Sequence, residues 1–186
     1  MSTTGDAGTT WVALLRGVNV GRNRRVRMAD LRAALSAAGA GEVRTLLQSG
    51  NVVLDASGSA DEVARLVHDA VLACSGHDVA VVVRTAAEFT AVVAATPMPD
   101  PPDGARYFVT FLAGQAADVD LPQLPEGSGE QWWRGQRELY VWCPEGLLES
   151  PVMGHFAGRR APTATVRNWN TVTALARLVG ATEDPA

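Results

Sequence analysis

Two segments of the chain match each other at an offset of 83 residues. Residues 82–94 (VVRTAAEFTAVVA) and 165–177 (TVRNWNTVTALAR) align without a gap and share four identities in thirteen positions, Arg84 with Arg167 among them. Four identities are weak on their own, because Val and Ala are common residues. The order of expected elements is shared as well, and internal similarity at a fixed period is the signature of a repeated unit. The sequence therefore predicts a tandem duplication.

The first copy has the pattern strand, helix, two strands, helix, strand. Apolar residues at positions 28, 31 and 35 have helical spacing, and capping residues and glycines delimit the segments. The expected elements are a strand over 11–20, a helix over 28–38, strands over 43–48 and 51–55 joined at Ser49-Gly50, a helix from Ser59 or Asp61 to Gly76, and a strand over 78–84. A further helix starts at Thr85, which forms a capping-box pair with Glu88.

The Pro-rich stretch TPMPDPPDG (96–104) marks the boundary between the copies. The pattern then begins again, with a first connection that is broken by prolines. The expected elements are a strand over 105–112, the connection over 116–127, hairpin strands over 129–134 and 137–142, an irregular helix over 145–158, a strand over 164–167, and a helix that Asn168 or Asn170 caps and that runs to Val179.

These patterns predict an α+β fold of two tandem ferredoxin-like βαββαβ repeats, each followed by an extra helix and packed as one compact unit. Continuous apolar runs such as WVALL (11–15) and YFVTFL (107–112) predict sheets that are covered on both faces. The expected organisation is a flexible tail over 1–10, the first repeat with its helix over 11–97, the second repeat with its helix over 98–181, and a tail over 182–186.

The composition excludes several classes of protein. With 186 residues and 47% apolar residues, the chain is not wholly disordered and can bury a core without disulfides or metal. No apolar run approaches the ~20 residues of a membrane span, and the start MSTTGDAGTT lacks the apolar stretch of a signal peptide. Two cysteines make no disulfide framework, so we expect a cytoplasmic location. All sixteen basic residues are arginine, which excludes Schiff-base and P-loop lysines.

Three motifs carry a resemblance to a known family. LLRGVNVG (14–21), QSGNVV (48–53) and TVRNWNT (165–171), together with the helix start at Met28 and Leu31, resemble the bacterial "domain of unknown function 1697" family. The resemblance covers about residues 11–180 and implies a duplicated ferredoxin-like fold, but no activity. The chain departs from the family pattern at Arg22, where a second glycine is usual, and at Leu46-Leu47, where an aromatic residue often precedes QSGN.

The first two motifs offer groups that could bind an anion. RGVNVG places Arg16 and Asn19 where the first strand leaves the sheet, and an arginine presents a planar fork to phosphate or carboxylate. QSGN offers Gln48, Ser49 and Asn51 beside it. Structural alternatives are a strand-to-loop turn with Arg16 in an ion pair, and a simple hairpin turn with positive φ at the glycine.

The third motif, VRNWNT, is the sharpest signal. Arg167 ends a strand, and Asn168, Asn170 and Thr171 open a helix whose N–H groups attract anions. We therefore expect a phosphate or carboxylate between the guanidinium and these amides. The alternative interpretation is an Asn cap with Trp169 in the core.

Other catalytic or metal sites are not indicated. His68, Cys74 and His77 are close in sequence, but one helix does not direct all three at one ion. We expect no metal and no cofactor, we identify no catalytic residues, and whether the chain is an enzyme stays open at this stage.

Three functional hypotheses follow. The favoured one is the binding of a small anionic ligand that carries phosphate or carboxylate. A nucleic-acid binder using the loop from Arg22 to Arg27 is the second, although the net charge of −4 and the lack of alternating aromatic residues argue against it. The third is a non-catalytic subunit that hides its apolar strands or tryptophans by self-association, for example as a homodimer. A membrane partner is not expected.

Overall fold

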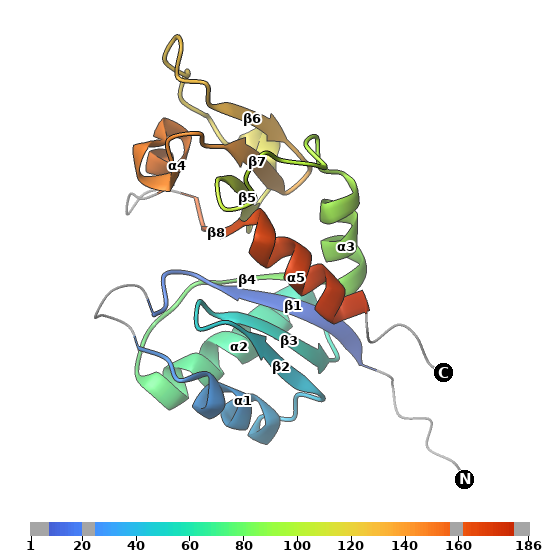
Figure 1. Ribbon diagram of the computed structural model, residues 1–186. Coiled ribbons are helices and arrows are strands. Elements are labelled where there is room, and N and C mark those ends of the chain that lie inside the picture. Colours follow the sequence, from blue (N-terminus) through green and yellow to red (C-terminus); the bar gives the residue numbers. More distant parts are fainter. Residues whose placement is uncertain (1–7, 20–24, 157–161, 181–186) are drawn as a thin grey trace. The chain divides into compact units, whose positions relative to one another are not determined.

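A computed structural model describes residues 8–19, 25–156 and 162–180 of the chain (Figure 1). Contacts divide it into two compact units, one from the described part of Met1–Phe89 and Arg177–Ala186 and the other from that of Thr90–Ala176. Expected features that lie outside the described residues are most of both tails, the end of the irregular helix at 157–158, and Arg22 and Arg24 of the basic loop. The expected repeat boundary after residue 97 stays a prediction.

The first unit contains a four-stranded antiparallel sheet and the predicted order of elements. Its strands are arranged as β2-β3-β1-β4, with every neighbouring pair antiparallel. The elements are β1 (Thr9–Leu15), α1 (Met28–Ala37), β2 (Val43–Leu46), β3 (Asn51–Ala56), α2 (Ala60–Ser75), β4 (Val81–Thr85) and the start of α3 (Ala86–Ala94).

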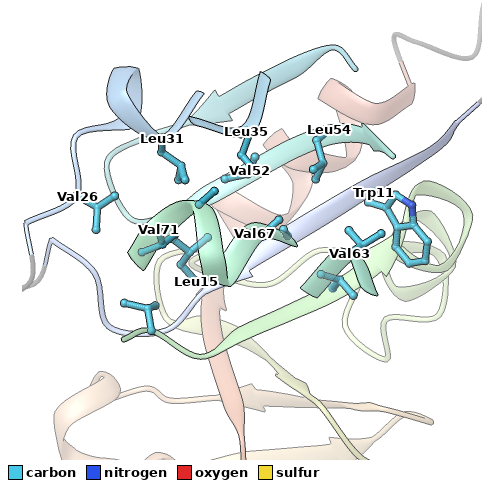
Figure 2. Packing of buried hydrophobic residues seen from close by; sticks show 14 of the residues in the cluster. Trp11, Leu15, Val26, Leu31, Leu35, Val52, Leu54, Val63, Val67 and Val71 are labelled. Atoms are coloured by element: carbon cyan, nitrogen blue, oxygen red, sulfur yellow. The ribbon is translucent and has the colours of Figure 1, made fainter. Parts of the chain in front are cut away.

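The core of this unit lies between the sheet and helices α1 and α2 (Figure 2). Leu31 and Leu35 of α1 and Val67 of α2 are fully buried against the sheet residues Val52 and Leu54. Their spacing in the helices is the spacing that predicted the two segments, because residues three and four apart share one face of a helix.

Side-chain caps define where two of the helices begin. Ser59 accepts a hydrogen bond from the amide of Glu62, and the Glu62 carboxylate accepts one of 2.7 Å from the amide of Ser59. Thr85 and Glu88 make the same reciprocal pair at 2.8 and 3.1 Å. Gly76 ends α2 with a φ of 71°. The predicted capping box of Thr85 and Glu88, the predicted cap at Ser59 and this helix end are confirmed.

The second unit also contains a four-stranded antiparallel sheet, with the order β6-β7-β5-β8. Its elements are β5 (Tyr107–Leu112), the 3-10 helix η1 (Ala116–Asp118), β6 (Gln131–Arg134), β7 (Glu138–Trp142), the 3-10 helix η2 (Leu147–Glu149), α4 (Pro151–His155), β8 (Ala164–Asn168) and α5 (Trp169–Gly180), whose last four residues belong to the first unit.

The expected βαββαβ order is wrong for the first connection of this second unit. Between β5 and β6 the chain forms only the three-residue η1, not an α-helix. Pro122 and Pro125 interrupt the segment, and Gly127 and Gly129 adopt positive φ. Prolines remove backbone donors and glycines disfavour helix, so no α-helix forms here.

Both faces of each sheet are buried. On the face of the first sheet opposite α1 and α2, Val12, Leu14 and Val53 expose at most 1% of their surface. In the second sheet Phe108 and Leu112 face the core that includes α4, while Tyr107 and Val109 are buried on the other face. The burial of these residues agrees with the prediction drawn from the continuous apolar runs.

Candidate functional site

Asn19 links the loop after β1 to the turn between β2 and β3. Its Nδ2 donates hydrogen bonds to the carbonyl oxygens of Val26 at 2.9 Å and Gln48 at 2.5 Å. Its Oδ1 accepts from the amide of Val26 at 2.9 Å. One carboxamide therefore holds together the two motifs RGVNVG and QSGN, which lie about 30 residues apart in the sequence.

The turn itself is closed from inside by Asn51. The Nδ2 of this fully buried residue donates to the carbonyl of Leu46 at 2.9 Å and to Oγ of Ser49 at 3.0 Å. The predicted hairpin is confirmed, with a turn over residues 47–50. Among the predicted site residues, Asn51 thus has a structural role that its burial and partners explain.

Gly50 lets the turn approach β1 closely. Its carbonyl accepts a hydrogen bond of 2.9 Å from the amide of Leu15, and its φ is 78°. A Cβ atom at this position would lie 2.5 Å from Cγ2 of Val18 and 2.8 Å from Cβ of Leu15. The adjacent amide of Arg16 donates to the carbonyl of Ala80 at 2.9 Å. The end of β1 is therefore fixed on both sides.

These contacts gather a basic and polar surface at one end of the first sheet. We call it the hairpin-end surface, and it comprises the exposed Arg25, Arg27, Leu47, Gln48 and Ser49 together with the half-buried Arg16. The Nε atom of Arg27 lies 3.7 Å from a carboxylate oxygen of Asp30, and its side chain remains 83% exposed. Charged side chains of this kind can reach a ligand at the surface.

Arg167 is buried at the end of β8. Its Nη1 donates to Oγ1 of Thr165 at 2.7 Å and to the carbonyl of Val166 at 2.8 Å. Burial lowers its pKa to about 10. Arg84, the matching residue of the repeat, is 1% exposed and donates in the same way to the carbonyl of Val83 at 2.8 Å. Both arginines bind the strand that carries them.

The start of α5 uses the amides that were expected to hold an anion. Asn168 accepts a hydrogen bond of 3.0 Å from the amide of Thr171, and Trp169 donates its amide to the carbonyl of Gly104 at 3.0 Å. The ring of Trp169 lies 5.4 Å from that of Tyr107. Asn170 is exposed. The geometry agrees with the structural alternative, an Asn cap with Trp169 in the core.

The predicted site residues fall into two groups. Arg16, Asn19, Gln48, Ser49 and Asn51 lie together in the first unit, whereas Arg167, Asn168, Asn170 and Thr171 lie in the second. A single site built from both groups stays a prediction.

Sequence reasoning left Leu47 out of the site and placed Arg25 and Arg27 only in the nucleic-acid alternative. The basic run RNRRVR signalled the arginines. Leu47 has no such signal, because its left-handed φ of 58° follows from the turn and not from its residue type.

Two further polar clusters occur. The imidazole of His68 lies 2.9 Å from a carboxylate oxygen of Asp69 and 3.0 Å from one of Asp78, and hydrogen bonds to these two raise its pKa. In the second unit Oγ of the buried Ser150 donates to Glu130 at 2.7 Å. In the described ranges no group of three or more His, Cys, Asp or Glu side chains could hold a metal ion.

Comparisons with known proteins place the chain in a family and a fold. The sequence profile described as "Protein of unknown function (DUF1697)" matches residues 9–140. The structure is similar to that of the conserved bacterial protein SP0830 from Streptococcus pneumoniae, with a TM-score of 0.68, 20% identity, and coverage of 93% of this chain and 99% of the other. No curated protein matches the sequence.

The fold and the family agree with each other. The structural neighbour is described as a conserved bacterial protein and the matched profile as one of unknown function, and the chain has the expected α+β composition. Of the described helices, none has the length and apolar character needed to cross a membrane. Because the profile matches well over half of the sequence, the chain belongs to the DUF1697 family of proteins of unknown function.

Proposed function

We propose that this protein binds a small anionic ligand, bearing phosphate or carboxylate, at the hairpin-end surface. Residues 16–32 hold six of the sixteen arginines and one acidic residue, Asp30, in a chain whose net charge is −4. Such a local excess of positive charge attracts anions against the overall field of the protein. Guanidinium groups also match the geometry of phosphate and carboxylate oxygens.

The observation that carries the proposal is the cross-link made by Asn19. Asn19 and Leu47 are the two described residues other than glycine with positive φ, at 55° and 58°. Both lie at this surface, and Asn19 is bonded to Gln48, the neighbour of Leu47. Asparagine adopts this region readily, whereas leucine is strained in it, and strained backbone that the surrounding contacts enforce clusters at functional sites.

The start of α5 is a weaker candidate for the same ligand. Two of its amides already have acceptors within the protein, and Arg167 donates to its own strand. At the hairpin end, in contrast, Arg25, Gln48 and Ser49 are exposed. The proposal therefore assigns the anion to the first unit and gives the α5 residues a mainly structural role.

Isothermal titration calorimetry with inorganic phosphate and with malonate tests the proposal at low salt. Arg25→Ala should weaken binding about tenfold or more, because a charge-assisted hydrogen bond contributes roughly 1.5–3 kcal/mol. Arg16→Ala is expected to act in the same direction. Arg65→Ala removes an exposed arginine of α2 and should leave affinity unchanged. Absence of binding to either anion, or equal affinity in all three variants, would overturn the proposal.

Nucleic acid is the alternative ligand for the same basic loop. Arg25 and Arg27 favour it, while the net charge of −4 argues against it. No aromatic side chain belongs to the hairpin-end surface as defined, so the stacking platforms typical of single-strand binders are missing from it. Retardation of a labelled single strand in a gel at low salt, lost in Arg25→Ala, would favour this alternative.

We further propose that the two units arose by duplication of a ferredoxin-like repeat. The strand orders β2-β3-β1-β4 and β6-β7-β5-β8 correspond. At the offset of 83 residues, β4 (Val81–Thr85) falls on β8 (Ala164–Asn168), and α3 and α5 begin at matching residues. An experimental structure in which the eight strands superpose in pairs would support the duplication, and a different strand pairing would contradict it.

Cytoplasmic location and self-association are also proposals. The presence of only two cysteines in the sequence, too few for a disulfide framework, supports a reducing compartment. Cell fractionation tests the location, and light scattering of the purified protein tests for a homodimer.

A further inference from the structure

The turn at the hairpin end presents an apolar side chain in an unfavourable backbone conformation. Leu47 is 60% exposed and has a φ of 58°. Residues with a Cβ atom rarely adopt this left-handed region, which glycine and asparagine occupy more readily. A leucine here neither relieves the backbone nor fills the core.

Hydrogen bonds connect the turn that Leu47 begins to the segments that carry the arginines proposed to bind the anion. It begins the turn of residues 47–50, and the last residue of that turn, Gly50, bonds to the amide of Leu15, the neighbour of Arg16. The carboxamide of Asn19 donates hydrogen bonds to the carbonyl of Gln48 and to that of Val26. Val26 lies between Arg25 and Arg27 in the sequence.

The other exposed large apolar side chains of the described residues have different surroundings. They are Leu72, Leu147 and Leu148. Leu147 and Leu148 stand between Glu145 and Glu149, and Leu72 follows Asp69 on α2. Leu47 thus combines exposure with neighbouring arginines, whereas these three stand near acidic residues.

We propose that the ligand is an amphipathic anion, whose phosphate or carboxylate binds the arginines and whose short apolar chain packs on Leu47. This inference rests on the proposed function and specifies its ligand class. Burying a methylene group on an apolar side chain strengthens binding, so affinity should rise with chain length while the chain stays in contact with Leu47.

Calorimetry with methyl, ethyl and butyl phosphate tests the inference. For the unaltered protein the affinity should rise roughly two- to fourfold per methylene group. In Leu47→Asn, which suits a positive φ and so preserves the turn, the affinity should be independent of chain length and equal to that for methyl phosphate. Leu72→Asn, a matched change on α2, should behave like the unaltered protein.

The outcomes separate the two proposals. If all three esters bind the unaltered protein and Leu47→Asn with the same dependence on chain length, the amphipathic ligand is wrong and anion binding stands. The same holds if chain length has no effect on the unaltered protein. If none of the esters binds while inorganic phosphate or malonate does, this inference alone is overturned; if no anion binds, the proposed function and this inference are both overturned. Thermal unfolding of Leu47→Asn, expected at or above the melting temperature of the unaltered protein, verifies that the turn is intact.

Discussion

The guanidinium of Arg44 in β2 donates a hydrogen bond of 3.0 Å from Nη1 to the carbonyl oxygen of Leu178 in α5. The two residues are 134 positions apart. Leu178 lies near the end of its helix, where carbonyl groups lack intrahelical partners and a positive charge is favourable. This contact explains locally how the last turn of α5 comes to belong to the first unit.

Arg44→Met should therefore destabilise the protein by about 1–2 kcal/mol, because it keeps the aliphatic stem and removes the hydrogen bond. Urea unfolding followed by circular dichroism measures the change. Arg32→Met is the control, since Arg32 is exposed and donates to Oγ1 of Thr45, a side chain of the neighbouring strand β2. Equal small losses in both variants would show that the contact with Leu178 contributes nothing.

Gly50→Ala should be more destabilising than Gly76→Ala, although both glycines have similar φ angles of 78° and 71°. The backbone cost of about 1–2 kcal/mol is common to both. Only at Gly50 would the new Cβ approach Val18 and Leu15 closely, whereas at Gly76 nothing lies within 4 Å. The overpacking should add about 1–3 kcal/mol. Equal free energies of unfolding for the two variants would contradict the close approach seen here.

His68 should make stability depend on pH. The hydrogen bond to Asp69, followed in magnitude by the one to Asp78, raises the pKa of His68 in the folded state above the ordinary value of 6.5. The charged form is thus favoured by folding, so its stabilisation is fully present below pH 6.5 and is lost as the pH rises through the folded pKa. The free energy of unfolding is measured from pH 5 to 9 for the unaltered protein and for His68→Gln. The difference between the two proteins should decrease as the pH rises from 6.5 through the folded pKa of His68. Parallel curves would contradict the assignment.

Cys143 should be unreactive in the folded protein. Burial raises its pKa to about 11, against the opposing hydrogen bond of Ser150. At pH 8 its thiolate is then roughly 100-fold rarer than at an ordinary thiol, and the side chain is only 1% exposed. In the single-cysteine variant Cys74→Ala, a disulfide reagent should label Cys143 at least 100-fold more slowly without urea than with it. Rapid labelling in the folded state would contradict this environment.

Local signals predicted the parts of the fold that depend on neighbours in sequence. Thr85 pairs with Glu88 as expected, since a capping box involves residues three apart, and Ser59, one of the two expected caps, begins its helix. Pro122 and Pro125 indicated a broken connection. The βαββαβ order predicted for both copies nevertheless implied an α-helix at this place. The analogy between the two copies overstated the similarity, because no favourable local propensity supported it.

The candidate site, too, was predicted only in part from the sequence. From the sequence, Asn19 and Gln48 were expected near each other, and Asn168 was one of two expected caps; the hydrogen bonds of both residues agree with these expectations. The sequence did not reveal that the carboxamide of Asn19 would bind Val26 and Gln48, or that Leu47 would adopt a left-handed φ in the same turn as Gln48.

By itself, then, the sequence determined the strands, most helices, their caps and the burial of both faces of each sheet, because periodicity and capping are local properties. Only the tertiary structure decided which predicted polar side chains are buried and hydrogen-bonded within the fold, such as Asn51 and Arg167, and which are exposed, such as Arg25 and Gln48. Hydrogen-bond partners far apart in the chain, like Arg44 and Leu178, are set by packing, and no local pattern encodes them.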